Sequence, residues 1–340
     1  MSARLTKTLA ALPAVAVLGL AMPASADEIS DFYSGKTVTV MVPSGLGGTL
    51  GLYGRLVAEH LGDHIPGKPT VIVQSRPGGG GTKGAAYAYN AAPKDGTYIA
   101  EVLAPSVFAP LLRSVKFDAS KFQWLGSLTP RPAVVSVWHT AAAKTLEEAK
   151  KIEIPMGSTG LGSETYIIPT LMNEVLGTKF KVVKGYKGGG AVNKAMEAQE
   201  VSGRMQYWSG WTAGKPTWLR DNLLVHLVQY GGVIPELPNV PQLASLVKSK
   251  EAKDMVAFIE TAPKIGMGFW VHHEVPKPRV AALRKAFMAM MADPKFLENT
   301  KKRRTPIEPV SGEVLDKLVA DAYATPPATI AKLKAILGFK

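Results

Sequence analysis

Short apolar runs alternate with helical patterns along most of the chain. Residues 38–42 predict a strand, and apolar residues recur at helical spacing through residues 50–61. A similar unit follows later, in which a strand at residues 152–156 leads into a Gly/Ser loop and a helix. Strands that alternate with helices are typical of α/β proteins. We therefore predict an α/β fold.

Further segments extend this pattern along the chain. Strands are expected at residues 71–73, 98–103, 134–138, 180–183, 205–208, 223–229 and 268–272, and the last helices at 278–291, near Ser311, and at 326–337. Because terminal helices without strands usually cap a sheet built earlier, we expect the chain to cross back near residues 260–268. This predicts two Rossmann-like α/β domains with a hinge and a ligand cleft between them. Domain 1 would comprise residues 27–130 and 266–340, and domain 2 residues 131–265.

The N-terminal segment has the features of a secretory signal peptide. Arg4 and Lys7 precede an apolar stretch at residues 9–22, and the small residues 24–26 form a cleavage site before Asp27. The stretch is shorter than the ~20 residues of a membrane span. The chain has no cysteine, so neither a lipidated cysteine nor a disulfide is available. We expect removal of residues 1–26 and export of the remaining chain.

The chain carries an excess of positive charge. Its 40 Lys and Arg residues against 27 Asp and Glu give +13, and loss of Arg4 and Lys7 with the signal would leave 13 − 2 = +11. This balance favours anionic partners, although a solvated basic surface is the simpler explanation of it. Basic and aromatic residues do not interleave as in a nucleic-acid-binding module, so we expect no nucleic-acid partner.

Glycine-rich loops follow the strands and precede the helices. Residues 43–49 and 157–165 each place glycines and hydroxyl side chains before a helix, where free backbone N–H groups and the helix dipole favour an anion. Neither loop has nucleotide-binding spacing: after Gly45 and Gly47 a dinucleotide fingerprint needs glycine where Leu50 stands. The sequence GGGGTKG likewise has threonine at the second glycine of a P-loop. We expect two opposed loops to clamp one small anion, without a cofactor.

Candidate catalytic or metal-binding groups are scattered. No Gly-x-Ser-x-Gly elbow occurs, and the pair His60 and His64 lacks the glutamate that follows the first histidine in a zinc helix. On a strand, the neighbours His272 and His273 would point to opposite faces and could not chelate together. We therefore expect neither a metal site nor an enzyme, and keep as the alternative an exported hydrolase or lyase acting on a small organic anion in the same cleft.

Six segments in order carry a family resemblance: TVTVMVPSGLGGTLGLYGRLVAEHL, VIVQSRPGGGGTKGA, AAPKDGTYI, GSTGLGS, GYKGGG and PELPNVPQL. Together they closely resemble the Bug family of periplasmic solute receptors that serve tripartite tricarboxylate transporters. The resemblance implies a Venus-flytrap fold that closes on a small organic acid. The acids implied are dicarboxylates, tricarboxylates, acidic amino acids and aromatic acids.

The resemblance also locates a ligand site in the two opposed loops and in the third loop. The residues expected to bind the ligand are Pro43, Ser44, Gly45, Gly47, Gly48, Thr49, Ala104, Ser106, Ser158, Thr159, Gly160, Gly162, Ser163, Thr165, Tyr186, Trp208 and Ser209. Some positions depart from the usual family pattern, among them Ser44, Leu46 and Thr49 in the first loop and Ser202 in place of an aspartate.

Two groups keep alternative interpretations open. The aromatic cluster Tyr207, Trp208 and Trp211 could wall the cleft and stack an aromatic acid, or could pack in the core. Arg131, at the expected crossover, could pair with a second carboxylate or point to solvent.

The sequence thus predicts a periplasmic binding protein, monomeric, that captures a small carboxylate and delivers it to a membrane permease of the tripartite tricarboxylate type. A signalling receptor would share this sequence pattern.

Overall fold

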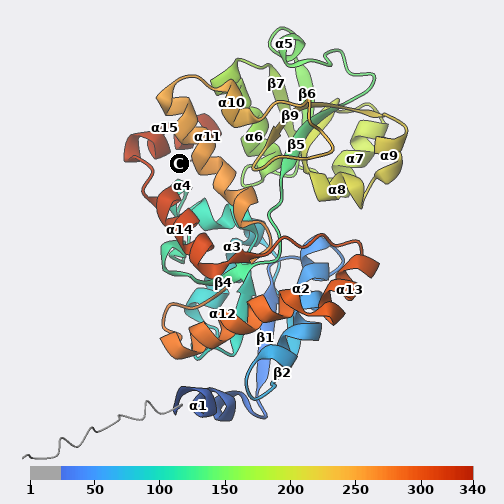
Figure 1. The fold of residues 1–340 in the computed structure, drawn as a ribbon. Coiled ribbons are helices and arrows are strands. Elements are labelled where there is room, and N and C mark those ends of the chain that lie inside the picture. Colours follow the sequence, from blue (N-terminus) through green and yellow to red (C-terminus); the bar gives the residue numbers. More distant parts are fainter. Residues whose placement is uncertain (1–23, 340) are drawn as a thin grey trace, which may run out of the picture.

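Two β-sheets, each covered by helices, form the two lobes of the molecule (Figure 1). The computed structural model describes residues 24–339. The first sheet has the strand order β11-β4-β10-β3-β1-β2. Its strands are β1 (Thr37–Val42), β2 (Thr70–Ser75), β3 (Tyr98–Glu101), β4 (Gln123–Ser127), β10 (Gly268–Val271) and β11 (Val310–Ser311).

The second sheet has the order β7-β6-β8-β5-β9. Its strands are β5 (Ala133–Trp138), β6 (Ile154–Ser158), β7 (Phe180–Lys184), β8 (Gly203–Tyr207) and β9 (Leu224–Tyr230). The prediction of two α/β domains is confirmed. Both sheets are mixed, however: β1 is parallel to β2 and β3, while β10 runs antiparallel to β3 and β4. In the second sheet β6 is parallel to β7 and β8, and β5 is antiparallel to both β8 and β9.

Helices connect the strands and cover the sheets. The α-helices are α1 (Ala24–Tyr33), α2 (Thr49–His60), α3 (Thr82–Asn90), α4 (Ala109–Leu112), α5 (Leu146–Ala149), α6 (Glu164–Leu176), α7 (Gly189–Glu197), α8 (Trp208–Thr212), α9 (Pro216–Arg220), α10 (Leu243–Leu246), α11 (Lys250–Ile265), α12 (Lys277–Ala292), α13 (Pro294–Lys302), α14 (Gly312–Tyr323) and α15 (Pro327–Leu337). The 3₁₀ turns are η1 (Leu61–His64), η2 (Gly79–Gly81), η3 (Ala104–Phe108) and η4 (Ala119–Lys121). Helices α2 and α12 bury Leu56 and Leu283 in one core with Phe269 of β10.

Helix α11 is the longest element that the sequence pattern did not predict. Ser249 caps its first turn by accepting a hydrogen bond from the amide of Ala252 (3.1 Å), and Met255, Val256 and Ile259 form its buried face. Pro263 lies in its last turn, and proline normally indicates that a helix ends before it.

The two sheets are joined by two segments that lie against each other, residues 128–132 and residues 263–267 at the end of α11, which we call the hinge segments. The amide of Leu128 donates to the carbonyl of Met267, and the amide of Met267 donates to the carbonyl of Thr129, both at 3.0 Å. Between them Gly266 has φ +57°, and a Cβ there would lie 2.1 Å from the Thr129 carbonyl oxygen. Only glycine fits this close approach of two backbones.

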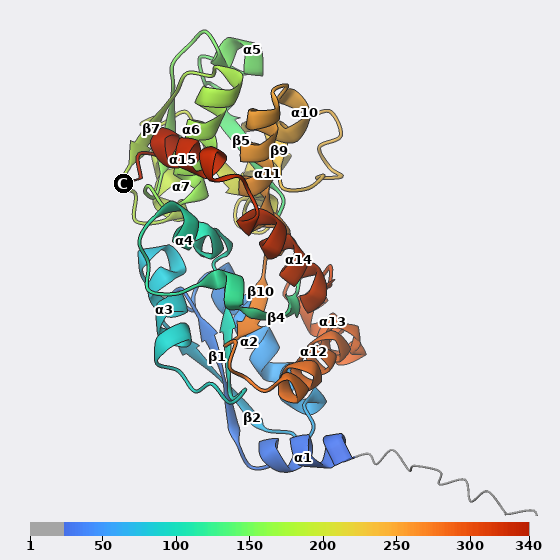
Figure 2. The same ribbon diagram turned by 90° about the vertical axis from the view of Figure 1, so that its left-hand side faces the viewer.

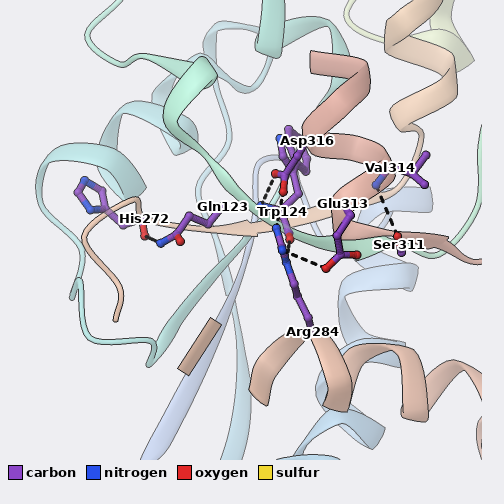
Figure 3. A network of polar contacts seen from close by, with 8 residues as sticks. All are labelled: Gln123, Trp124, His272, Arg284, Ser311, Glu313, Val314 and Asp316. Carbon is purple, nitrogen blue, oxygen red and sulfur yellow. Dashed lines mark hydrogen bonds and ion pairs between the residues drawn. The ribbon is translucent and has the colours of Figure 1, made fainter. Parts of the chain in front are cut away.

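The C-terminal helices span both lobes. Figure 2 shows α14 running from beside β4 toward the second lobe, where α15 lies next to α6 and α11. Arg284 of α12 holds α14 in place, because it donates to the Trp124 carbonyl at 2.7 Å and pairs with Glu313 and Asp316 of α14 (Figure 3). The predicted domain boundaries stay a prediction, but the last helix packs on the second lobe rather than on the first sheet.

The predicted signal peptide lies almost wholly outside the described residues. Only its last three residues, Ala24 to Ala26, are described, and they belong to α1. Within residues 24–339, no helix has both the length and the apolar character needed to cross a bilayer.

The hinge segments generate a stability prediction. Gly266→Ala should lower the free energy of unfolding by about 3 kcal/mol or more, because the new Cβ meets the Thr129 carbonyl in a strained conformation. Gly177→Ala is the matched control: Gly177 also has positive φ (+73°), but nothing lies within 4 Å of its Cβ position. It should cost only about 1–2 kcal/mol. Equal losses in urea unfolding would contradict the close-approach account.

Candidate functional site

A cavity of about 460 Å³ lies between the two lobes. The first lobe contributes the glycines of η2, the start of η3 and Arg113. The second contributes the loop before α6, the first residue of α7 and most of β8. The lining residues are Gly79, Gly80, Leu103, Pro105, Arg113, Thr159, Gly160, Leu161, Gly162, Ser163, Glu164, Thr165, Gly189, Arg204, Met205, Gln206 and Tyr207. The two glycine loops face each other, since a Cβ on Gly80 would lie 3.9 Å from the Gly162 carbonyl oxygen.

The loop before α6 is held rigid by its own hydroxyl groups. Ser163 is the N-cap and accepts a hydrogen bond from the Thr165 amide at 3.2 Å. The Thr165 hydroxyl lies 2.8 Å from that of Ser163 and 3.1 Å from that of Ser158, and it accepts from the Thr159 amide at 3.1 Å. The thirteen-residue helix α6 therefore presents a fixed N-terminus to the cavity, where the helix dipole favours negative charge.

Arg204 places a buried positive charge at the same cavity. It lies on β8 with 3% of its surface exposed. Its Nη1 donates to the Gly189 carbonyl at 2.7 Å and to Asn193 Oδ1 at 2.9 Å, and its Nε donates to the Met205 carbonyl. No carboxylate lies within 4.0 Å of Arg204 among residues 24–339, and Nη2 has no acceptor there. Burial lowers the pKa of Arg204 to about 10, so the group still carries its charge at neutral pH.

Arg113 adds a second cation from the first lobe. It follows α4, and its Nη2 donates to the Gly79 carbonyl at 3.3 Å. The same nitrogen would lie 3.3 Å from a Cβ on Gly162, across the cavity. Arg113 forms no ion pair with any described carboxylate. Two arginines without acidic partners thus line a cavity that also receives a helix N-terminus, an arrangement that favours an anion.

The structure brings together part of the predicted site. Thr159, Gly160, Gly162, Ser163 and Thr165 line the cavity. Five further predicted residues are not among the lining residues: Ala104, Ser106 and Ser158 are buried, and Tyr186 and Ser209 are half-buried.

The first predicted loop lies outside this cavity lining. Pro43 is buried, Ser44 is half-buried, and Gly45, Gly47, Gly48 and Thr49 are exposed. The loop is tied to its own lobe, since Arg55 donates to the Leu46 carbonyl and Ser75 donates to the Ser44 carbonyl. Its part in binding stays a prediction.

The aromatic cluster divides between the two interpretations. Tyr207 lines the cavity, whereas Trp211 is fully buried and packs near Trp218 at 5.7 Å between ring centroids. Trp208 lies edge-on against His226 and does not line the cavity. Among these rings, only Tyr207 is placed to touch a ligand in this cavity.

Several lining residues were not predicted, above all Gly79, Gly80, Arg113 and Arg204. For Arg204 the signal was present: a charged side chain stands between Val201 and Met205 in a segment that forms a strand, and a buried charge is rarely retained without a partner. Arg113 had no such signal, because its place depends on how the two lobes face each other.

Comparison with known proteins identifies the family. Residues 54–334, most of the chain, match the model of the tripartite tricarboxylate transporter family receptor. The chain belongs to this receptor family. A curated relative from Agrobacterium vitis, described as a UPF0065 protein in the TAR-I ttuE-ttuC' intergenic region, is 25% identical over 316 residues, which cover 91% of this chain and 83% of the relative. The resemblance to the Bug family is confirmed.

Solved structures show the same fold. The periplasmic binding protein BugD is 22% identical with a TM-score of 0.66, and the match covers 91% of this receptor and 99% of BugD. A Rhodopseudomonas palustris protein with adipate is 19% identical with a TM-score of 0.64 (89% and 98% covered). MatC from the same organism, with bound malate, is 19% identical with a TM-score of 0.60 (89% and 99% covered).

Arg131 of the receptor lies at the hinge rather than in open solvent. It is half-buried, its guanidinium carbon lies 3.7 Å from the centre of the Tyr207 ring, and its Nε is buried without an acceptor among the described residues. Both carboxylate oxygens of Glu101 nearby are also buried and unpartnered within residues 24–339. Burial raises the pKa of Glu101 well above its ordinary value, which favours the neutral carboxyl, and Arg131 opposes this shift.

The prediction that His272 and His273 point to opposite faces is wrong. Strand β10 ends at Val271, so strand alternation no longer applies, and the two rings lie 4.1 Å apart between centroids. With Glu274 they form the group among the described residues whose side chains could meet at a metal ion. The Glu274 carboxylate is already paired with Lys94 at 3.0 Å. His272 Nδ1 accepts from the Glu274 amide, whereas His272 Nε2 is buried without a partner among the described residues.

A larger hollow, about 610 Å³, lies in the first lobe between α12, β4 and α14. Its arginine, Arg284, is neutralised by Glu313 and Asp316 (Figure 3). The charge of Arg284 is therefore already balanced by acidic partners, whereas Arg113 and Arg204 in the cavity between the lobes have none among the described residues.

The carboxyl group of Glu164 makes stability depend on pH. Burial raises the pKa of Glu164 to about 7, opposed by Arg131 and by the hydrogen bond from Tyr230. Its stabilising contribution is therefore complete below the unfolded value of 4.5 and lost as pH rises through about 7. Glu164→Gln should remove this loss, which is roughly 3 kcal/mol, and so gain stability relative to the natural protein at pH 8 but not at pH 4.5.

Urea unfolding at both pH values measures this difference. The control, Glu147→Gln, removes an exposed carboxylate whose pKa is lowered by a hydrogen bond from Lys150. This control variant should not be more stable than the natural protein at pH 8. A Glu164→Gln difference that is independent of pH would show that the carboxyl group titrates normally.

Proposed function

We propose that this receptor captures a small carboxylate in the cavity between its lobes and delivers it to a membrane permease. The proposal places the protein in the periplasm and treats it as a binding protein that returns its ligand unchanged. The predicted loop residues 43–49 and 157–165 are part of this proposal, as the two sides that close on the ligand.

The observation that carries the proposal is the uncompensated charge of Arg204. A buried guanidinium without an acidic partner is costly, and a ligand carboxylate would supply the missing counter-charge. Charge-assisted hydrogen bonds between arginine and carboxylate are also among the strongest in proteins. The N-terminus of α6 and Arg113 border the same space, so a bound anion would meet positive potential from both lobes.

The relatives support a carboxylate of small size. Adipate and malate are the ligands named for two structures with this fold, and both are dicarboxylates. The cavity volume of about 460 Å³ lies within the usual range for small-molecule sites. Family membership supports a transporter as the destination of the ligand.

A thermal-shift screen tests the proposal. Malate, adipate, citrate and benzoate would be compared with a neutral sugar, at concentrations up to saturation. A ligand at 100 times its Kd should stabilise the fold by ~2.7 kcal/mol, which is visible as a rise in Tm. A rise with the sugar and with no carboxylate would contradict the proposal. Recovery of a chemically altered acid would instead favour the hydrolase or lyase alternative.

Two arginine variants locate the site. Arg204→Met should weaken carboxylate binding roughly 30-fold or more, because a buried charge partner is removed. Arg220→Met is the control, since Arg220 lies exposed on α9 and pairs with Asp221. It should leave the Kd unchanged in calorimetry. Equal effects of the two variants would place the binding site elsewhere.

A further inference from the structure

Glu164 is a carboxyl group inside a cavity that otherwise favours anions. It is the first residue of α6, directly after the N-cap Ser163, and only 4% of its surface is exposed. It also lines the cavity, together with the two unpaired arginines Arg113 and Arg204. When ionised, it would compete with a ligand for the same positive potential.

Charged and titratable groups surround Glu164 from several elements. Tyr230 of β9 donates a hydrogen bond to Glu164 Oε1 at 3.3 Å. The charge of Arg131, in the hinge segments, lowers the pKa of both Glu164 and Tyr230. The remaining groups that face this cluster are Glu101 of β3, Tyr53 of α2, Glu260 of α11 with its partner Lys264, and the cavity residues Arg113, Arg204 and Tyr207.

We propose that capture of a carboxylate in this cavity is coupled to uptake of a proton by Glu164. The inference rests on the proposed function, and it deepens it by naming the residue that makes affinity depend on pH. A protonated Glu164 carries no charge that repels the ligand, whereas an ionised Glu164 places a second negative charge beside it.

The sign of the effect follows from this geometry. The pKa of Glu164 is already raised to about 7 by burial, and a bound anion raises it further. Affinity should therefore be constant below about pH 7 and should fall above it, by up to about tenfold per pH unit, until the pKa of the complex is reached.

Calorimetric titration of the full chain with malate, and separately with adipate, tests the coupling between about pH 6.5 and about pH 8.5. Both ligands are almost fully ionised in this range, because ordinary carboxyl pKa values lie near 4. The natural protein should lose affinity about tenfold across the upper part of the range. Glu164→Gln should bind with an affinity that does not change with pH and that stays close to the low-pH value of the natural protein.

Glu260→Gln is the matched control. Glu260 is also buried, its pKa is also raised by burial, and its charge raises the pKa of Tyr230. However, it does not line the cavity. This variant should keep the pH dependence of the natural protein. Loss of the pH dependence in Glu260→Gln, but not in Glu164→Gln, would overturn the assignment.

Proton uptake can be measured without any variant, so the test survives if Glu164→Gln does not fold. Titrations near pH 7.5 in triethanolamine and in Tris, two cationic buffers of different ionisation enthalpy, should show a fraction of a proton bound per ligand. Tight binding with no proton uptake and no pH dependence would overturn the role of Glu164 and leave the proposed function intact. If no carboxylate binds at any pH, the proposed function itself fails.

Discussion

The close approach of the hinge segments sets the geometry on which the cavity depends. Gly266 lies against the Thr129 carbonyl, and paired backbone hydrogen bonds continue on both sides of that contact. The two sheets are therefore held end to end, and the loops that follow their strands face each other. Helix α15, packed on α6 and α11, adds a third connection between the lobes.

Within this frame the charges are unevenly satisfied. The arginine that fastens α14, Arg284, has two acidic partners, whereas Arg204 at the cavity has neutral acceptors only. A fold that needed only stability would neutralise a buried cation or replace it by an apolar side chain. Arg284 is therefore a structural arginine, whereas the charge of Arg204 remains available for a ligand. For this reason the smaller cavity, between the lobes, is the better candidate site.

Much of the fold could be predicted from the sequence because its signals are local. The strand and the loop before α6 were confirmed, since the apolar period and the Gly/Ser loop depend on nearby residues. The reversed direction of β10 and the return of α15 to the second lobe depend on long-range packing, and no local pattern encodes them. The same limit applies to the site. The hydroxyl loop at Ser163 was predicted from its own sequence, whereas Arg113 joins it only through the arrangement of the lobes.

The central claim is that a carboxylate fills the cavity as the counter-charge of Arg204. A crystal structure of the protein grown with malate or adipate tests it most directly. We predict density for one carboxylate within hydrogen-bonding distance of Arg204 or of the backbone amides at the start of α6. Density for the acid in the hollow beside Arg284, with the cavity between the lobes filled by water alone, would contradict the account.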